Sequence, residues 1–379
     1  MHLLILAMNV LQLSGSVKYD GRSTRQQAIG NTMNWHHIRY PEPLHPGDTI
    51  GITAPSSGVS EKLHPRLELC IQHLRNQGFK VIEGECLRGN NKHVSAPREK
   101  RARDLLALWK NKEVKAILPP WGGELLIHLL PCIDFNELAT ATPKWLLGYS
   151  DTSALLFALT TMTGIATAHG TTLMEMVPGQ CVVSQRWKDV LSLRPGETLR
   201  QESSQAFQIK GVRWEAEPAA QFHLSEKTNW QCLRRGQPLT AVSFSGRTIG
   251  GCMDTLSCLA GTPFGDIRQF AERVERDGIV LYLENVEKNP TDMCRILWNL
   301  RLAGWFERLT GLVLGRSAAQ DDDAFTYMDA LHDVFDDMDI PVIYDADVGH
   351  RPPQITIING ALASFTCADG RGAVQLTLS

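Results

Sequence analysis

The sequence lacks the features that mark several large classes of protein. No apolar run reaches the roughly 20 residues that a membrane helix needs, and Asn9 and Gln12 interrupt the best candidate, residues 3–13. The formal net charge is only −3, from 38 basic and 41 acidic residues. Such a balance creates no large positive field. We therefore expect neither a membrane partner nor a nucleic-acid partner.

Signature motifs of metal and nucleotide sites are also missing. The nine cysteines include no C-x-x-C pair, which is typical of reduced thiols in the cytoplasm. The sequence contains no H-E-x-x-H, no G-x-x-x-x-G-K-S/T and no G-x-G-x-x-G. These absences argue against a catalytic zinc, a P-loop and a dinucleotide fingerprint. We expect no metal ligands and no cofactor.

What is present is an ordinary globular composition, 43% hydrophobic and 21% charged over 379 residues. That length is sufficient for two domain-sized cores. Residues 14–32 are polar and without pattern, and Met33 opens the segment that leads into structured sequence. We expect residues 1–32 to be a disordered leader or an over-extended gene start.

From residue 49 short apolar runs alternate with helix-period segments, each turn marked by Gly or Pro. Repeated βα units predict an α/β fold with a parallel sheet covered on both faces. Residues 178–240 break this rhythm, and the chain ends in short alternating, strand-like segments. The predicted divisions are a leader (1–43), an N-terminal α/β domain (44–177), a connector or active-site loop region (178–240) and a C-terminal mixed α/β, β-rich domain (241–379).

The first candidate for chemistry is Gly148-Tyr149-Ser150-Asp151, which lies between an apolar strand and an apolar helix. A serine on such a sharp turn presents its hydroxyl at the edge of the sheet, as in a nucleophile elbow. The helix behind it offers free N–H groups and a positive dipole end, which suit an oxyanion. The alternative is that Ser150 or Asp151 merely caps the helix.

The glycine pair Gly122-Gly123 also follows a predicted strand. Paired glycines let backbone N–H groups approach a ligand closely, so they are candidates for the other half of an oxyanion hole. The alternative is a plain turn.

Two residues of the second half complete the set. His350 is a candidate general base, with a surface-loop histidine as the alternative and His169 as its competitor. Glu284 ends the strand-like run IVLYLE, where a carboxylate needs a partner. That partner is a histidine or, alternatively, Arg295. Because the carboxyl ends of strands form the ligand crevice in open α/β sheets, Ser150, Glu284 and His350 are predicted to converge.

Several segments together resemble one family, the serine peptidases that include murein LD-carboxypeptidases and microcin C immunity peptidases. In the family's order they are GDTIGITAPSS (47–57), SAPREKRARDL (95–105), PPWGGE (119–124), PKWLLGYSDTSAL (143–155), IGGCMDTL (249–256), LYLENVE (281–287), GLVLGR (311–316) and VGHRPPQITIINGA (348–361). They span residues 44–375. Trp121 and the long middle section look more like the microcin-immunity branch than the murein branch.

The resemblance implies an N-terminal Rossmann-like domain, a smaller C-terminal domain and a homodimer. It assigns Ser150 as nucleophile, His350 as base and Glu284 as the orienting acid, with oxyanion donors at the backbone of Asp151 and Gly123.

The resemblance also implies a substrate that is a small peptide, a murein peptide or a peptidyl-nucleotide, with Gly122 in its binding site. In the immunity enzymes an aromatic of the middle section stacks on the nucleobase. Trp214 and Trp230 are its possible counterparts, and packing beneath the loop is the alternative for each. A peptide-binding homologue without catalysis is the remaining alternative.

Overall fold

The computed structural model describes residues 35–379. The expectation for residues 1–32 therefore lies outside the described residues. Residues 35–43, which we had placed in the leader, are packed against the fold. Trp35 is buried, and its indole N–H donates to the carbonyl oxygen of Thr161 at 3.1 Å. Ile38 and Leu44 are buried as well, so apolar side chains anchor this stretch.

The first sheet has the strand order β15-β5-β4-β3-β1-β2. Its strands are β1 (Thr49–Ile52), β2 (Lys80–Glu83), β3 (Val114–Leu118), β4 (Trp145–Gly148), β5 (Thr167–His169) and β15 (Ile357–Asn359). β1 to β5 pair in parallel, as predicted from the βα rhythm, whereas β15 pairs antiparallel with β5. The order 2-1-3-4-5 is that of a doubly wound sheet, whose switch point lies between β1 and β3.

The second sheet has the order β10-β9-β14-β13-β12-β11-β16-β17-β6. Its strands are β6 (Thr198–Glu202), β9 (Gln231–Arg234), β10 (Gln237–Leu239), β11 (Ala241–Cys252), β12 (Ile279–Glu284), β13 (Leu309–Gly315), β14 (Pro341–Ala346), β16 (Leu362–Ala368) and β17 (Arg371–Thr377). The central β11 to β14 are parallel and the flanking pairs antiparallel. The chain therefore has the predicted fold class, a parallel α/β domain followed by a mixed, β-rich one.

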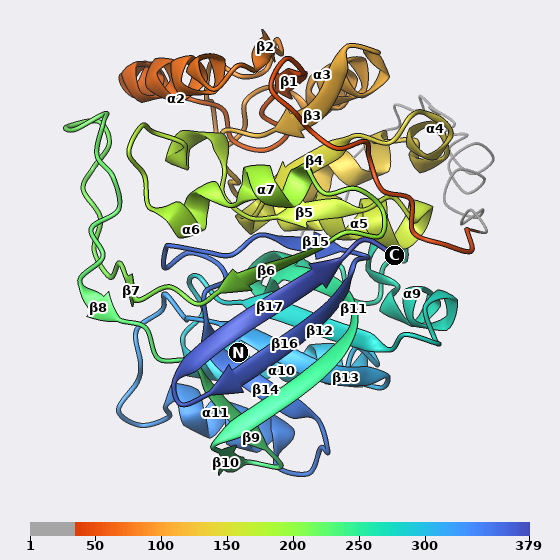
Figure 1. Cartoon of the computed structure of the whole chain (residues 1–379), viewed down its shortest axis with the longest axis vertical. Coiled ribbons are helices and arrows are strands. Elements are labelled where there is room, and N and C mark those ends of the chain that lie inside the picture. The colour runs from red at the N-terminus through yellow and green to blue at the C-terminus, as the bar shows by residue number, and fades with distance from the viewer. Residues whose placement is uncertain (1–34) are drawn as a thin grey trace, which may run out of the picture. The chain divides into compact units, whose positions relative to one another are not determined.

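Helices cover and separate the two sheets (Figure 1). They are α2 (His64–Asn76), α3 (Arg98–Lys110), α4 (Phe135–Thr140), α5 (Ser153–Thr163), α6 (Val182–Gln185), α7 (Trp187–Leu191), α8 (Met253–Leu256), α9 (Ile267–Arg273), α10 (Pro290–Leu302) and α11 (Tyr327–Phe335). The 3-10 turn η1 (Glu61–Leu63) precedes α2, and a second 3-10 turn, η2 (Leu126–Cys132), follows β3. Among residues 35–379, no helix combines the length and apolar character needed to cross a bilayer.

Helix α5 explains how the two sheets meet. It contacts β4 and β5 of the first sheet and β11 of the second, and nearly all of its side chains are buried. A helix that is apolar all round belongs in the interior rather than on a surface. At its start, the Ser153 hydroxyl accepts a hydrogen bond from the backbone N–H of Cys252, at the end of β11, at 3.0 Å. The start of α5 therefore lies where the strand ends of both sheets converge.

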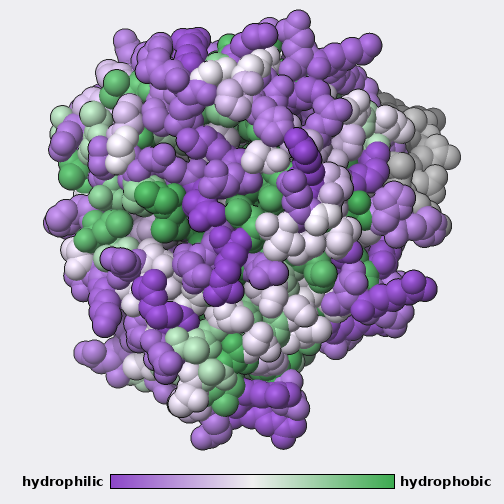
Figure 2. Space-filling view, in the orientation of Figure 1, coloured by the Kyte–Doolittle hydropathy of each residue, from purple (hydrophilic) through white to green (hydrophobic). Residues whose placement is uncertain are grey.

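The segment 178–240 has more regular structure than its sequence pattern indicates. It contributes β6, β9 and β10 to the second sheet, and β7 (Ala206–Phe207) pairs with β8 (Glu226–Lys227) as a separate ribbon. The side chains of β10 are exposed, and those of β6 largely so. Such edge strands carry no clean apolar alternation, which is the signal that sequence reasoning needs. On the face in Figure 2, hydrophilic residues predominate and hydrophobic ones form small separate groups.

Candidate active site

Ser150 occupies a strained turn between a strand and a helix. β4 ends at Gly148, and the 3-10 turn η3 (Ser150–Thr152) runs directly into α5. Ser150 has φ +60°, a left-handed conformation that is unfavourable for a residue with a side chain. The residues in the capping positions are Tyr149 and Thr152, and neither makes a side-chain cap. The alternative interpretation, that Ser150 or Asp151 caps the helix, is therefore wrong. The turn has the form of a nucleophile elbow.

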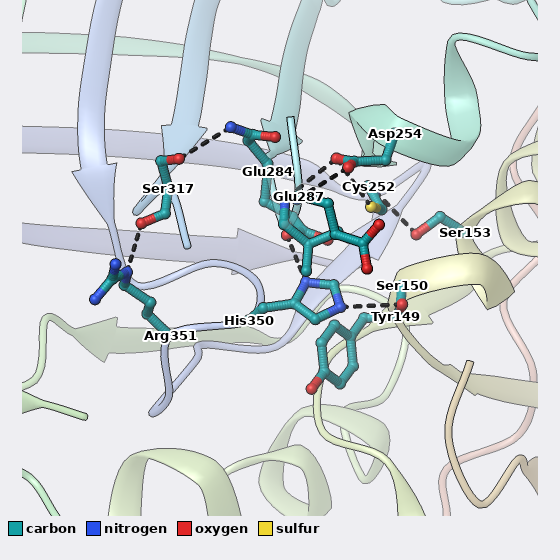
Figure 3. A network of polar contacts seen from close by, with 12 residues as sticks. Tyr149, Ser150, Ser153, Cys252, Asp254, Glu284, Glu287, Ser317, His350 and Arg351 are labelled. Atoms are coloured by element: carbon teal, nitrogen blue, oxygen red, sulfur yellow. Dashed lines mark hydrogen bonds and ion pairs between the residues drawn. The ribbon is translucent and has the colours of Figure 1, made fainter. Parts of the chain in front are cut away.

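His350 lies within hydrogen-bond distance of both other residues that were predicted to converge with it. Nε2 of His350 is 3.0 Å from Oγ of Ser150, and Nδ1 of His350 is 2.8 Å from Oε2 of Glu284. Figure 3 shows the imidazole between the hydroxyl and the carboxylate. Glu284 is fully buried at the end of β12, and the His350 side chain is 19% exposed. These distances are those expected of a nucleophile, a base and an orienting acid.

The competing assignments for these residues do not hold. Arg295 pairs with Asp292 at 2.5 Å rather than with Glu284. His350 is mostly buried, unlike a surface-loop histidine. His169 is buried, and both of its ring nitrogens are without a hydrogen-bond partner in the described chain. Burial lowers the pKa of His169 to about 4, so it is neutral at physiological pH.

The protonation states of the pair are set by burial and by each other. Burial acts to lower the pKa of His350, but the charge and hydrogen bond of Glu284 outweigh it, and the pKa is raised above its ordinary value. Burial acts to raise the pKa of Glu284, but the charge and hydrogen bond of His350 leave it lowered. The carboxylate is therefore ionised and ready to stabilise an imidazolium.

Gly122 packs directly against the Ser150 turn. A Cβ placed on Gly122 would lie 2.8 Å from the backbone nitrogen of Asp151 and 2.9 Å from Oγ of Ser150. Gly123 has φ +145°, and a Cβ there would lie 2.4 Å from Oγ of Ser57. Both positions therefore require glycine, so this is more than a plain turn. The chain places the backbone of the glycine pair and of Asp151 beside the hydroxyl.

The side chain of Asp151 hydrogen-bonds to two neighbouring loops and not to the Ser150 hydroxyl. Its Oδ2 accepts hydrogen bonds from Oγ of Ser56 at 2.5 Å and from the backbone N–H of Leu126 at 2.8 Å. Burial raises the pKa of this carboxyl. Ser56 follows β1, the glycine pair follows β3 and Ser150 follows β4. Asp151 thus ties together the three loops at the switch point of the first sheet.

Two cavities share Gly123, Ser150 and His350 in their linings. One of about 390 Å³ is lined by Gly123, Glu124, Ile127, Ser150, Asp151, Cys252, Asp254, Thr255, Cys258, Val286, Glu287, Lys288 and His350. The other, of about 330 Å³, is lined by Ser57, Asn90, Trp121, Gly122, Gly123, Tyr149, Ser150 and His350. Because Ser150 and His350 line both cavities, a bound molecule that fills the two must pass the hydroxyl.

Sequence reasoning missed several residues of this site. The Tyr149 ring lies edge-on to His350 with centroids 4.8 Å apart, and its hydroxyl donates to Oε1 of Glu175 at 2.8 Å. Cys252 and Asp254 come from the segment IGGCMDTL, and Lys288 follows Glu284 by four residues. The available signal for Cys252 and Asp254 was that family-like segment. No local sequence feature indicates that the Tyr149 ring or the Lys288 side chain belongs to the site.

The two middle-section tryptophans lie elsewhere. Trp230 is 1% exposed, and its indole N–H donates to Oδ2 of Asp347 at 3.2 Å. Trp214 lies against the guanidinium of Arg66, 3.9 Å from the ring centroid. Neither tryptophan lines the two cavities at Ser150. The structure does not bring either tryptophan to the site. Both side chains pack within the fold, as the alternative for each had it.

Comparison with family models gives two matches. The model of the LD-carboxypeptidase N-terminal domain matches residues 50–170, and that of the LD-carboxypeptidase C-terminal domain matches residues 245–365. The first range contains the glycine pair and Ser150. The second contains Glu284 and His350.

Curated relatives agree with these matches. A putative carboxypeptidase of Vibrio cholerae is 27% identical over 83% of this chain and 91% of its own length. The microcin C7 self-immunity protein MccF of Escherichia coli is 25% identical over 85% of this chain and 91% of its own. A probable murein peptide carboxypeptidase of Bacillus subtilis is 24% identical over 89% and 95%.

Solved structures share the fold. MccF in complex with glutamyl sulfamoyl guanosine superposes with a TM-score of 0.76 at 22% identity, covering 89% of this chain and 98% of its own. At that identity the likeness concerns the fold alone. With both domain models matched in order over more than half of the sequence, the chain belongs to the LD-carboxypeptidase family and is a serine peptidase.

Proposed function

We propose that this enzyme hydrolyses an amide bond near the C-terminus of a small peptide or peptidyl-nucleotide, through a Ser150-His350-Glu284 triad. The observation that carries the proposal is the chain of contacts from Oγ of Ser150 through both ring nitrogens of His350 to Glu284. Such a chain needs a buried acid, a neutral base and an exposed hydroxyl. An intact set of all three argues against a purely binding homologue.

The proposed reaction is acyl transfer to serine followed by hydrolysis. His350 takes the Ser150 proton as the hydroxyl attacks the amide carbonyl, and the resulting imidazolium protonates the leaving amine. Backbone N–H groups of Gly123 and Asp151 stabilise the oxyanion. Water then enters, gives its proton to His350 and releases the acid. Glu284 fixes the tautomer of the imidazole and stabilises its cation.

The two cavities give this reaction room for a group on each side of the scissile bond. Lys288 is a cationic side chain in the larger cavity, and its charge suits the terminal carboxylate of a peptide. Trp121 and Tyr149 line the other cavity, and aromatic faces suit a flat base. Proteins related to this chain include a microcin self-immunity protein and a probable murein peptide carboxypeptidase.

We favour the immunity-like substrate, a peptidyl- or aminoacyl-nucleotide, with murein tetrapeptide as the second candidate. The test is to incubate the purified full chain with an aminoacyl sulfamoyl nucleoside and with murein tetrapeptide, and to identify products by mass spectrometry. Ser150→Ala serves as the control for each. Cleavage of murein tetrapeptide alone would reverse the preference. If Ser150→Ala cleaves either substrate at the native rate, Ser150 has no part in the mechanism.

We further propose a homodimer that works in the cytoplasm. All nine cysteines are free thiols, which suits a reducing compartment. Exposed large hydrophobic side chains of the segment 178–240, Val182, Ile209 and Val212, are candidates for a subunit contact. Light scattering coupled to size exclusion gives the mass directly, and a monomer at micromolar concentration would refute the dimer.

A further inference from the structure

A cysteine thiol lies beside the proposed triad, and the proposed mechanism gives it no role. Cys252 ends β11, and Glu284 is its direct partner at the end of the parallel neighbour β12. The Cys252 sulfur, a Glu284 carboxylate oxygen and a ring nitrogen of His350 all lie within 4.8 Å of one another. Cys252 is 1% exposed and Glu284 is fully buried. Two adjacent strand ends and one loop therefore bring a thiol, a carboxylate and an imidazole together (Figure 3).

Glu284 has bonding capacity that the triad does not use. Oε2 accepts the hydrogen bond from His350, whereas Oε1 is buried and accepts no conventional hydrogen bond from the described residues. Beside the carboxylate is the Cys252 thiol, a weak donor. A buried carboxylate oxygen is seldom left without a strong partner, so this oxygen is available to a cation.

The surroundings favour a cation and give it a way in. The larger cavity carries the acidic side chains of Glu124, Asp254 and Glu287 against Lys288, and Cys252 and His350 lie in its wall. Oδ2 of Asp254 is 3.7 Å from the Cys252 sulfur. A hydrated ion that enters from solvent therefore reaches the thiol through a cavity with an excess of negative charge.

We propose that Cys252, Glu284 and His350 form an inhibitory site for a thiophilic divalent cation such as Zn²⁺. Thiolate, imidazole and carboxylate are the ligands that zinc takes in proteins, with about 2.3 Å to sulfur and 2.0–2.2 Å to nitrogen and oxygen. Ligand atoms bound at those lengths around one tetrahedral ion lie about 3.3–3.7 Å apart. The more distant pairs, up to 4.8 Å apart, therefore close in by about 1 Å, the hydrogen-bonded Glu284 and His350 part to admit the ion, and water from the cavity fills the fourth position. Zn²⁺ displaces the thiol proton to solvent as the Zn–S bond forms, and the neutral imidazole carries its one N–H on the nitrogen that does not bind the metal. No electron transfer is involved.

Bound metal stops the proposed hydrolysis because it takes the groups that the triad needs. If Nε2 of His350 binds Zn²⁺, it cannot accept the Ser150 proton. If Nδ1 binds Zn²⁺, the imidazole loses its hydrogen bond to Glu284. The inhibition rests on the proposed function, whereas the binding does not. Spacing motifs in the sequence gave no sign of this site, because its ligands come from β11, β12 and the loop after β14.

The test uses the full chain and reads binding separately from activity. Titration with Cd²⁺ is followed by the ultraviolet thiolate-to-cadmium charge-transfer band, with Cys252→Ser, Cys252→Ala and Cys258→Ser as variants. Cys258 is an exposed thiol of the same cavity, so its variant is the matched control. We expect the band in the native chain and in Cys258→Ser, and no band in either Cys252 variant. Circular dichroism verifies that each variant is folded.

Zinc inhibition is then measured as the ratio of rates with and without Zn²⁺ for each variant. We expect loss of the thiolate to raise the half-inhibitory concentration by about 100-fold or more, since even outer-shell changes weaken metal sites about 10- to 100-fold. A band that depends on Cys258, or the absence of any band, would overturn the site. Inhibition that is unchanged in both Cys252 variants would overturn it as well. A Cys252-dependent band in a chain that cleaves no substrate would uphold binding and refute the proposed function alone.

Discussion

Replacing Glu284 by Gln removes the charge of the buried acid while nearly keeping its shape. In the native chain the carboxylate lies 2.8 Å from Nδ1 of His350 and raises the pKa of that histidine against the opposing effect of burial. The base acts only when it is neutral, so activity falls as pH drops through the pKa of His350 in the folded chain. Glu284→Gln lowers this pKa, and the acidic limb of the pH–rate profile moves to lower pH.

The size of the effect follows from the hydrogen bond that changes. A bond to a charged group contributes about 1.5–3 kcal/mol and a neutral one about 0.5–1.5 kcal/mol. The difference of about 1–1.5 kcal/mol corresponds to a roughly 5- to 10-fold weaker affinity of the imidazole for its proton. Turnover falls much further, by about 10⁴, because the amide no longer fixes the right tautomer or stabilises the imidazolium in the transition state.

The proton affinity is measured by NMR titration of the His350 ring, with the signal assigned by its loss in His350→Gln. Glu287→Gln is the matched control, since it makes the same chemical change at an exposed side chain that lines the larger cavity together with His350. We expect the His350 midpoint to shift in Glu284→Gln and to stay in place in Glu287→Gln. A midpoint in Glu284→Gln equal to the native one would refute the coupling, whatever happens to the rate.

Four further variants probe the turn and its support. Ser150→Ala and Ser150→Gly should both lower turnover by about 10⁴–10⁶. Ser150→Gly should be the more stable of the two by about 1 kcal/mol in urea unfolding, because φ +60° suits glycine; equal stability would contradict the strain. Gly122→Ala should cut kcat more than it raises KM, since its methyl crowds the Asp151 nitrogen and Ser150; unchanged kinetics would contradict that contact. Asp347→Asn breaks the buried pair with Arg316, 2.5 Å apart, and should cost about 3–5 kcal/mol of unfolding free energy. A loss below about 1 kcal/mol would show that the pair is dispensable.

Sequence reasoning succeeded where a signal is local and repeats along the chain. Apolar runs followed by glycine or a polar residue marked β3, β4 and β12, and the candidate residues Ser150 and Glu284 came from the ends of such runs. A parallel sheet places its carboxyl strand ends at one edge, which accounts for Glu284 beside His350. Ser150 comes from the other sheet and meets them through the packing of the two sheets around α5. The sheet order, with β15 returning to the first sheet, carries no local signal and was not predicted.

The failures occurred where contacts are between distant segments. Trp214 and Trp230 were candidates because the family resemblance implies a stacking aromatic in the middle section, yet the sequence does not show where an indole points. Trp230 donates to Asp347, which also accepts from Ser204 and Arg316. No spacing rule links residues 204, 230, 316 and 347, so only the fold reveals the cluster.

That cluster gives the middle segment a structural part in the proposed chemistry. Asp347 lies three residues before His350, and its carboxylate accepts from the backbone N–H and the hydroxyl of Ser204, each at 2.7 Å. Arg316, which follows β13, donates to Asp347 and to the carbonyl oxygens of Arg351 and Pro353 on the other side of the histidine. The loop that carries the imidazole is therefore held at both ends. Fixing that loop keeps Nε2 in line with a hydroxyl from the other sheet, since an error of 1 Å in such a contact can lower the rate about 10²-fold.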